Sequence, residues 1–230
     1  AQMVLRDDWI VRLTPTDNRE LRAAMAVAKA RSATIPKLTA QDFPLPTLAR
    51  ALGALCEEII AGRGFALLRG LEIDDLPVKD AALIYWGIGS HMGRGRAQNA
   101  QGDMLGHVTD LGLDFRTDNN ARGYQTRLRL PFHNDTSDIV ALMCLNPAKS
   151  GGLSRIVSSA AVYNAVLERR PDLMPELTTP MCIDRRGENT PGRKPYYVGA
   201  TFERLNDRLF CRYNRTYIES GQRFEEVPRL

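Results

Sequence analysis

Up to about residue 95, apolar residues recur with the spacing of amphipathic helices. Three stretches show this period: residues 16–30, about 46–62 and 77–93. In the first, Asp17 can cap the helix and Glu20, three residues later, can complete a capping box. Between the second and third stretches, the short apolar run 64–71 is bounded by glycines and predicts a buried strand.

Beyond residue 95 the pattern changes from helical to extended. Residues 98–123 are rich in Gly, Asp and Asn and predict a long loop, which is usually functional or flexible in a compact domain. Alternating or continuous apolar runs then predict strands over residues 124–135, 138–148 and 149–159. A helix that begins at Ser158 or Ser159 interrupts these strands, and a second, shorter helix follows before Pro180.

The last predicted element is a pair of strands within residues 194–215, joined by a turn at Asn206-Asp207. Helices first and mostly antiparallel strands afterwards indicate an α+β or mainly β fold, such as a helix-decorated sandwich. We find no linker that divides the chain. We therefore expect a single domain over residues 1–230, helical up to about residue 95, with a β-core from about residue 124.

Composition places the chain among ordinary globular proteins. Of its 230 residues, 43% are hydrophobic and 25% are charged. No apolar run approaches the ~20 residues of a membrane span, and no signal peptide is visible. The four cysteines are scattered without a C-x-x-C pair, which indicates buried free thiols. We therefore expect a cytoplasmic protein with no membrane association.

The formal net charge is +4, and most of the excess lies within residues 185–215. Acidic residues are interleaved with the basic ones there, so a solvated face or a pocket for small acidic substrates is favoured over a nucleic-acid interface. We expect no nucleic-acid partner.

The pair His133 and Asp135 carries the clearest chemistry. Two residues apart on a strand, both side chains face the same way and can reach one metal ion. Imidazole and carboxylate suit a divalent first-row metal, and one more histidine would complete the facial triad of non-haem Fe(II) oxygenases. A surface or turn pair is the alternative interpretation. The two other histidines, His91 and His107, both lie upstream.

Residues 130–177, "LPFHNDTSDIVALMCLNPAKSGGLSRIVSSAAVYNAVLERRPDLMPEL", resemble the TauD/TfdA-like family of Fe(II)- and 2-oxoglutarate-dependent dioxygenases. The resemblance implies a double-stranded β-helix (a jelly-roll, clavaminate-synthase-like) flanked by helices. It makes His133 and Asp135 the proximal iron ligands and catalytic residues. It also implies that Ser154 helps to bind 2-oxoglutarate, after a tight turn at Gly151-Gly152, and that Arg129 lies on the substrate side.

One departure from the family is plain. The family's distal histidine and its 2-oxoglutarate-binding arginine lie farther toward the C-terminus, and no histidine follows His133 here. We therefore expect that the C-terminal strands are missing from this chain. His91 and His107 do not match the distal position and are interpreted as loop or hydrogen-bonded histidines. Besides Arg129, the candidate substrate contacts in the long loop are Gln98, Asn99 and His107.

The leading hypothesis is an oxidoreductase with Fe(II) as cofactor and 2-oxoglutarate as co-substrate. It would hydroxylate a small, acidic organic substrate with O2 and release succinate and CO2. The alternative is a non-catalytic scaffold of the same fold that lacks a complete iron site. The sequence leaves open the identity of the substrate and the formation of a homo-oligomer.

Overall fold

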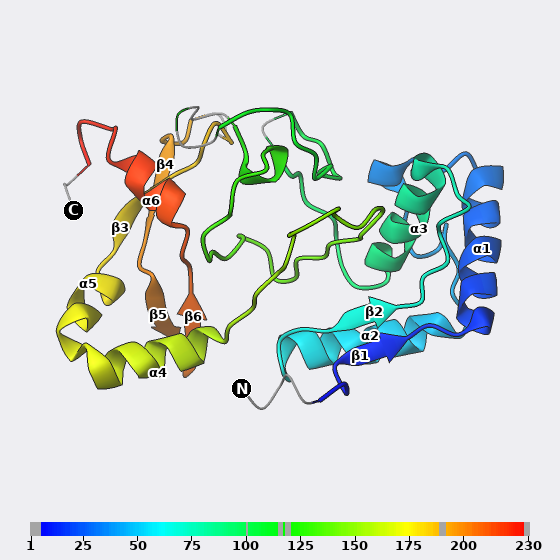
Figure 1. The fold of residues 1–230 in the computed structure, drawn as a ribbon, viewed down its shortest axis with the longest axis horizontal. Helices are drawn as coiled ribbons and strands as arrows, with labels where there is room; N and C mark the ends of the chain where they lie inside the picture. The colour runs from blue at the N-terminus through cyan, green and yellow to red at the C-terminus, as the bar shows by residue number, and fades with distance from the viewer. Residues whose placement is uncertain (1–5, 100, 115–116, 118–120, 189–191, 228–230) are drawn as a thin grey trace. The chain divides into compact units, whose positions relative to one another are not determined.

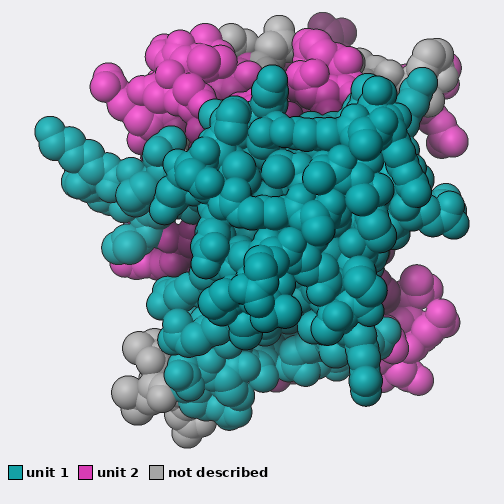
Figure 2. Space-filling model, turned by 90° about the vertical axis from the view of Figure 1, so that its right-hand side faces the viewer, with its two compact units in different colours: residues 1–96, 138–153 teal, residues 97–137, 154–230 magenta. Residues whose placement is uncertain are grey.

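The structure is a computed structural model that describes residues 6–99, 101–114, 117, 121–188 and 192–227. Contacts divide the chain into two compact units, each made of two segments (Figure 2). Unit 1 comprises residues 1–96 and 138–153, and unit 2 comprises residues 97–137 and 154–230. The prediction of a single domain over residues 1–230 stays a prediction.

Unit 1 is built from three helices and a small parallel sheet (Figure 1). The elements are β1 (Ile10–Arg12), α1 (Pro15–Ala30), the 3-10 turn η2 (Ile35–Lys37), α2 (Leu48–Ile60), β2 (Leu67–Arg69) and α3 (Val78–Ser90). β1 pairs with β2 in parallel. The apolar faces of the three helices share one core, in which Leu21, Phe43 and Leu52 are almost fully buried. All three predicted helices are confirmed, and the predicted strand forms as β2 but is only partly buried.

The start of α1 differs from the prediction. Its N-cap is Thr14, whose hydroxyl accepts from the Asp17 N–H, while the Asp17 carboxylate accepts from the Thr14 N–H. The capping box therefore begins three residues before the predicted one. Glu20 instead accepts hydrogen bonds from the backbone N–H groups of Thr47 and Leu48, at the start of α2. Proline is favoured at the first position of a helix, so Pro15 makes the residue before it, Thr14, the N-cap.

Unit 2 holds two antiparallel pairs of strands and several short helices (Figure 1). The elements are η3 (Gly123–Gln125), α4 (Ser159–Arg169), η4 (Pro171–Leu173), α5 (Met174–Thr178), β3 (Met181–Asp184), β4 (Tyr196–Gly199), β5 (Phe202–Leu205), β6 (Arg208–Cys211) and α6 (Arg215–Gly221). β3 pairs with β4, and β5 pairs with β6. Ser158 caps α4, as predicted.

The predicted turn at Asn206-Asp207 joins β5 to β6. Both residues have positive φ, 48° and 60°, which is the geometry of a two-residue hairpin turn. Helix α6 packs on β3, and Gly221 permits the approach, because a Cβ there would lie 2.7 Å from the Cys182 carbonyl oxygen. Strands β1 and β3 and helix α6 are additions to the predicted elements.

The strands predicted over residues 124–135, 138–148 and 149–159 are not formed. The described residues there contain one isolated β-bridge, between His133 and Asn214. No backbone N–H of residues 138–157 donates to the backbone of any described residue. A strand requires a neighbouring strand whose carbonyl groups accept these N–H groups. Apolar side chains that the pattern assigned to a core are exposed, such as Leu153 at 87%.

Two further findings bear on the composition. All four cysteines are free, as predicted, but Cys144 is exposed and the other three are partly exposed, so they are not buried thiols. Among the described residues, no helix combines the length and the apolar character required to cross a bilayer.

Candidate functional site

The side chains of His133 and Asp135 face one another in unit 2. The His133 Nε2 lies 3.9 Å from the Asp135 Oδ1, and the two side chains are 33% and 54% exposed. The sequence prediction that these two groups point to one place is confirmed, although the residues lie on an extended segment and not on a sheet strand.

The tautomer of His133 follows from its other ring nitrogen. Nδ1 lies 2.8 Å from the Pro131 carbonyl oxygen, and a carbonyl only accepts, so Nδ1 carries the proton. Nε2 faces Asp135, and in the neutral imidazole it is the nitrogen left free to bind a metal. A backbone carbonyl on the far nitrogen is the usual arrangement behind a metal-binding histidine.

These two residues fit a divalent first-row metal. With metal bonds of about 2.1 Å, neighbouring octahedral ligands lie about 3 Å apart, so a modest side-chain rotation would bring both atoms to one ion. A third ligand is not supplied by the described part of the chain, where no group of three or more His, Cys, Asp or Glu side chains could hold a metal.

Asn134 fixes the segment between these two residues. Its backbone N–H donates to the Tyr213 carbonyl at 2.8 Å, and its side-chain oxygen accepts from the Tyr213 N–H at 3.0 Å. The Cys211 thiol approaches the same oxygen at 3.4 Å. These hydrogen bonds from the loop between β6 and α6 therefore fix the segment that carries His133 and Asp135.

Tyr217, in the first turn of α6, lies close to two buried arginines. The guanidinium carbons of Arg122 and Arg186 lie 5.8 and 5.7 Å from the centre of its ring, and Arg122 Nη1 donates to its hydroxyl at 2.9 Å. Burial raises the pKa of Tyr217, and the positive charge of Arg122 acts in the opposite direction.

The two arginines hold one another in place. Arg122 Nη2 donates to the Arg186 carbonyl at 2.8 Å and to Glu188 at 2.6 Å, and Arg186 Nη2 donates to the Ala121 carbonyl at 2.9 Å. The fully buried Asp184 accepts the Arg186 N–H, the Ser220 hydroxyl and an Arg223 N–H. Asp184 thus ties the turn that carries Arg186 to α6.

A cavity of about 430 Å³ opens beside these arginines, and we name it the arginine pocket. All of its lining residues belong to unit 2. They are Asn99, Gln101, Asp103, Leu113, Ala121, Arg122, Tyr124, Gln125, Arg186 and Gly187.

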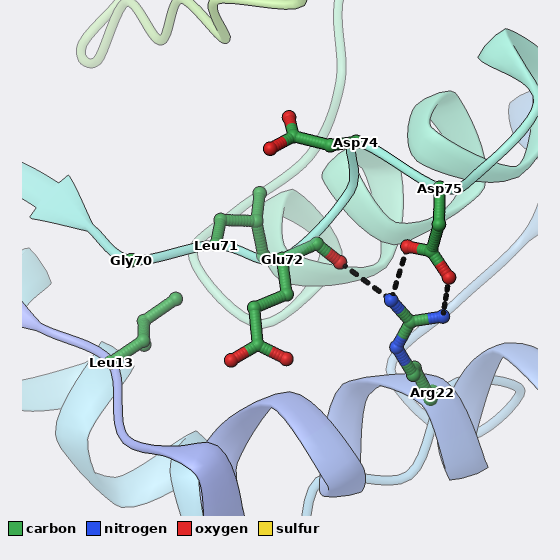
Figure 3. A pocket seen from close by; sticks show the side chains of 7 residues that line it. All are labelled: Leu13, Arg22, Gly70, Leu71, Glu72, Asp74 and Asp75. Atoms are coloured by element: carbon green, nitrogen blue, oxygen red, sulfur yellow. Dashed lines mark hydrogen bonds and ion pairs between the residues drawn. The ribbon is translucent and has the colours of Figure 1, made fainter.

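Unit 1 has a hollow of different character, of about 640 Å³ (Figure 3). Its polar residues are Arg22, Glu72, Asp74 and Asp75, and Arg22 binds both Asp75 oxygens, at 2.6 and 3.1 Å. This paired arrangement holds α1 to the segment after β2, as Figure 3 shows.

The other predicted site residues are distributed more widely. Asn99 lines the arginine pocket, where its side chain donates to Asp103 at 2.7 Å. Gln98 is exposed, and its backbone N–H donates to the Asp103 carbonyl. Arg129, His107 and Ser154 are exposed, and none contacts His133 or Asp135 among the described residues. Their predicted roles stay predictions.

His91 forms a hydrogen bond in unit 1, which agrees with one of the two interpretations given from the sequence. Its Nε2 lies 2.7 Å from the Phe43 carbonyl oxygen. This contact fixes the end of α3 on the loop before α2.

The cluster of Arg122, Arg186 and Tyr217 was not predicted from the sequence. Arg186 lies in the basic stretch for which a pocket was one of two interpretations, but its burial of 96% was not foreseen. Arg122 precedes a glycine at the end of the long loop, and no local pattern marks it as buried.

Comparisons with known proteins found a matching family model and similar proteins. The family model described as "Taurine catabolism dioxygenase TauD, TfdA family" matches residues 30–228. FR-33289 synthase of Streptomyces rubellomurinus (strain ATCC 31215) is 32% identical over 222 residues, covering 96% of this chain and 66% of that protein. Taurine hydroxylase-like protein SAT17 of Stachybotrys chartarum (strain CBS 109288 / IBT 7711) is 29% identical over 218 residues, covering 92% and 56%. The chain therefore spans only part of the length of both relatives.

Proposed function

Because the chain belongs to the taurine catabolism dioxygenase TauD, TfdA family, we propose that it is part of an Fe(II)- and 2-oxoglutarate-dependent oxygenase. The reaction hydroxylates a small, acidic organic substrate with O2 and releases succinate and CO2. The observation that supports this most directly is that His133 Nε2 lies 3.9 Å from the Asp135 Oδ1, with the Pro131 carbonyl on the other ring nitrogen. For the fold, we propose the double-stranded β-helix with flanking helices that the family implies.

In this proposal His133 and Asp135 hold the iron. Bound Fe(II) supplies the redox chemistry that activates O2. The Pro131 carbonyl keeps the proton of His133 on Nδ1, and the contacts of Asn134 with Tyr213 keep the segment in place. We assign Ser154 to 2-oxoglutarate and Arg129, Gln98, Asn99 and His107 to the substrate side, on the family resemblance and the loop composition.

The test is succinate formation by the full-length protein with Fe(II), 2-oxoglutarate and a panel of small carboxylates and sulfonates. His133→Ala and Asp135→Asn are expected to lose iron binding and turnover together. Asp138→Asn is the matched control, because this aspartate is exposed, lies three residues away and forms no hydrogen bond or ion pair with described residues. Full activity in His133→Ala would refute the assignment.

A second candidate function is a non-catalytic scaffold of the same family. It is favoured by one observation, that no third metal ligand joins His133 and Asp135 in the described ranges. A full-length protein that binds no iron at the stoichiometry of one per chain and forms no succinate would support the scaffold over the oxygenase.

A further inference from the structure

Asn214 lies directly opposite His133 in the isolated antiparallel β-bridge. The neighbouring pair, Asn134 and Tyr213, is the hydrogen-bonded one, since the Asn134 N–H donates to the Tyr213 carbonyl at 2.8 Å. Antiparallel pairs alternate, so His133 and Asn214 form the closer kind of pair, which exchanges no hydrogen bond of its own. Opposite residues have their side chains on the same face, with Cβ atoms about 4.5–5.5 Å apart. The side chain of Asn214 therefore lies beside the imidazole of His133.

Asp135 belongs to the same face. Side chains two residues apart on an extended segment face the same way, and the Asp135 Oδ1 lies 3.9 Å from the His133 Nε2. The two candidate metal ligands and Asn214 therefore share one face of the bridge. Asp135 is exposed and Asn214 is partly exposed, so this face is open to a small molecule.

Helix α6 sets the orientation of the Asn214 amide. Asn214 is the N-cap of this helix, and its Oδ1 accepts the Tyr217 N–H at 3.3 Å. Because the oxygen is bound to the helix, the amide nitrogen Nδ2 is the end of the side chain that stays available. Nδ2 donates to no described residue. Asn214 thus offers two N–H donors next to the candidate iron ligands.

The cap by itself does not require an asparagine. Ser, Thr and Asp also cap helices well, because each has an oxygen that accepts a backbone N–H. Helix α1 uses the hydroxyl of Thr14 and helix α4 uses that of Ser158. What asparagine adds is an N–H donor, and an N–H bound to an anionic oxygen forms one of the stronger hydrogen bonds in proteins.

We propose that Asn214 is a specificity-determining residue, whose Nδ2 donates a hydrogen bond to an acidic oxygen of the small molecule bound beside His133 and Asp135. This inference rests on the proposed function and deepens it. The acidic group is a carboxylate or a sulfonate. It belongs either to 2-oxoglutarate or to the substrate, and both present the same oxygen chemistry to the amide.

The experiment is isothermal titration of the full-length protein, loaded with Fe(II) in the absence of O2. The ligands are 2-oxoglutarate alone, and acetate and methanesulfonate in the presence of saturating 2-oxoglutarate. Asn214→Asp keeps an oxygen for the Tyr217 N–H but replaces the donor by a negative charge. At least one ligand is expected to bind at least about tenfold more weakly, the loss typical of a hydrogen bond to a charged group.

A second variant removes the donor without adding a charge. Asn214→Gly loses the whole side chain, and glycine is tolerated at an N-cap with little loss of stability. The same ligand should again bind at least about tenfold more weakly. Asn206→Asp is the matched control, because it makes the same change of amide to carboxylate in the exposed β5–β6 turn, where aspartate tolerates the positive φ. It is expected to leave all dissociation constants unchanged.

Titration with Fe(II) alone distinguishes a donor from a merely structural cap. Asn214→Gly is expected to bind Fe(II) as tightly as the parent protein, because His133 and Asp135 are unchanged and the hydrogen bonds between Asn134 and Tyr213 remain. If the affinity for Fe(II) fell in parallel with that for the ligand, Asn214 would only hold the segment in place, and the proposal would be overturned.

The pattern of losses identifies the source of the acidic group. A loss confined to 2-oxoglutarate assigns the contact to the co-substrate, and a loss confined to acetate and methanesulfonate assigns it to the substrate. The proposal is overturned if a folded variant weakens none of the ligands that bind the parent protein to the expected extent. Succinate formation by the parent protein would then leave the proposed function intact. A parent protein that binds no Fe(II) and forms no succinate refutes the proposed function, and the role of Asn214 with it.

Discussion

Asn134 determines how firmly the candidate iron ligands are held. Its backbone and side chain both bind Tyr213, across a sequence distance of 79 residues. His133 and Asp135 are otherwise on an extended segment without a neighbouring strand. A ligand pair on such a segment depends on a few contacts, so each of them has a measurable effect on metal affinity.

Asn134→Ala is therefore expected to weaken iron binding by about tenfold, in the range seen for residues that orient metal ligands. The Tyr213 N–H loses its acceptor, while His133 and Asp135 are unchanged. Thr136→Ala, at an exposed neighbour that forms no hydrogen bond with described residues, serves as the control. Iron titration of the full-length protein measures both, and equal affinities in the two variants would contradict the role of Asn134.

The proximity of His133 and Asp135 could be predicted from the sequence because the two residues are only two positions apart. The arginine cluster could not. Arg122 and Tyr217 are 95 residues apart, and their contact depends on the turn at Arg186 and on the packing of α6 against β3. Charged residues in a mixed stretch are mostly exposed, so composition alone favours a solvated face.

Among the elements, helix α3 shows how close packing depends on one glycine. Gly87 is buried, and a Cβ at this position would lie 2.5 Å from ring carbons of Phe43, which is completely buried. Gly89, in the same helix, is exposed, and a Cβ there would meet nothing within 4 Å. The two glycines therefore form a natural pair for comparison.

Gly87→Ala is expected to lower the free energy of unfolding by about 1–3 kcal/mol, because the methyl group overpacks the core. Gly89→Ala is expected to have no such cost and to gain up to about 1 kcal/mol from helix propensity. Urea unfolding followed by circular dichroism measures both variants. Equal stability of the two would mean that Phe43 does not pack against α3 as described.

Most helices were predictable from the chain because their period and caps are local. The errors concern the cap of α1 and the short helix α6, which was not predicted. Strands were less predictable from the chain than helices. The apolar runs of residues 138–148 and 149–159 have the pattern of strands, but a strand also requires a partner, which a local pattern does not reveal. The hairpin β5–β6 was predictable, since the Asn-Asp turn brings its own partner.

For the whole molecule, burial of ionisable side chains sets the response to alkaline pH. Burial raises the pKa of Tyr85, Tyr197 and Tyr217 above the ordinary value of 10.0, and it raises the pKa of the Cys211 thiol in the same way. In the unfolded chain these groups release their protons at lower pH than in the folded protein.

The folded state therefore holds more protons than the unfolded state above about pH 9–10, and stability is expected to fall as the pH rises through this range. Urea midpoints measured from pH 7 to 11 test this. Tyr217→Phe removes one of the titrating groups and should flatten the decline. A midpoint that stays constant or rises above pH 10 would contradict the expectation.

The division into two units also affects how the protein is made. Residues 138–153 belong to unit 1, where Tyr85 binds the Ala141 carbonyl at 2.6 Å, but they follow residues 97–137 of unit 2 in the chain. During synthesis unit 1 cannot be completed until the first segment of unit 2 has left the ribosome. A protease cut between residues 96 and 97 would likewise not separate the units, because two further peptide crossings connect them.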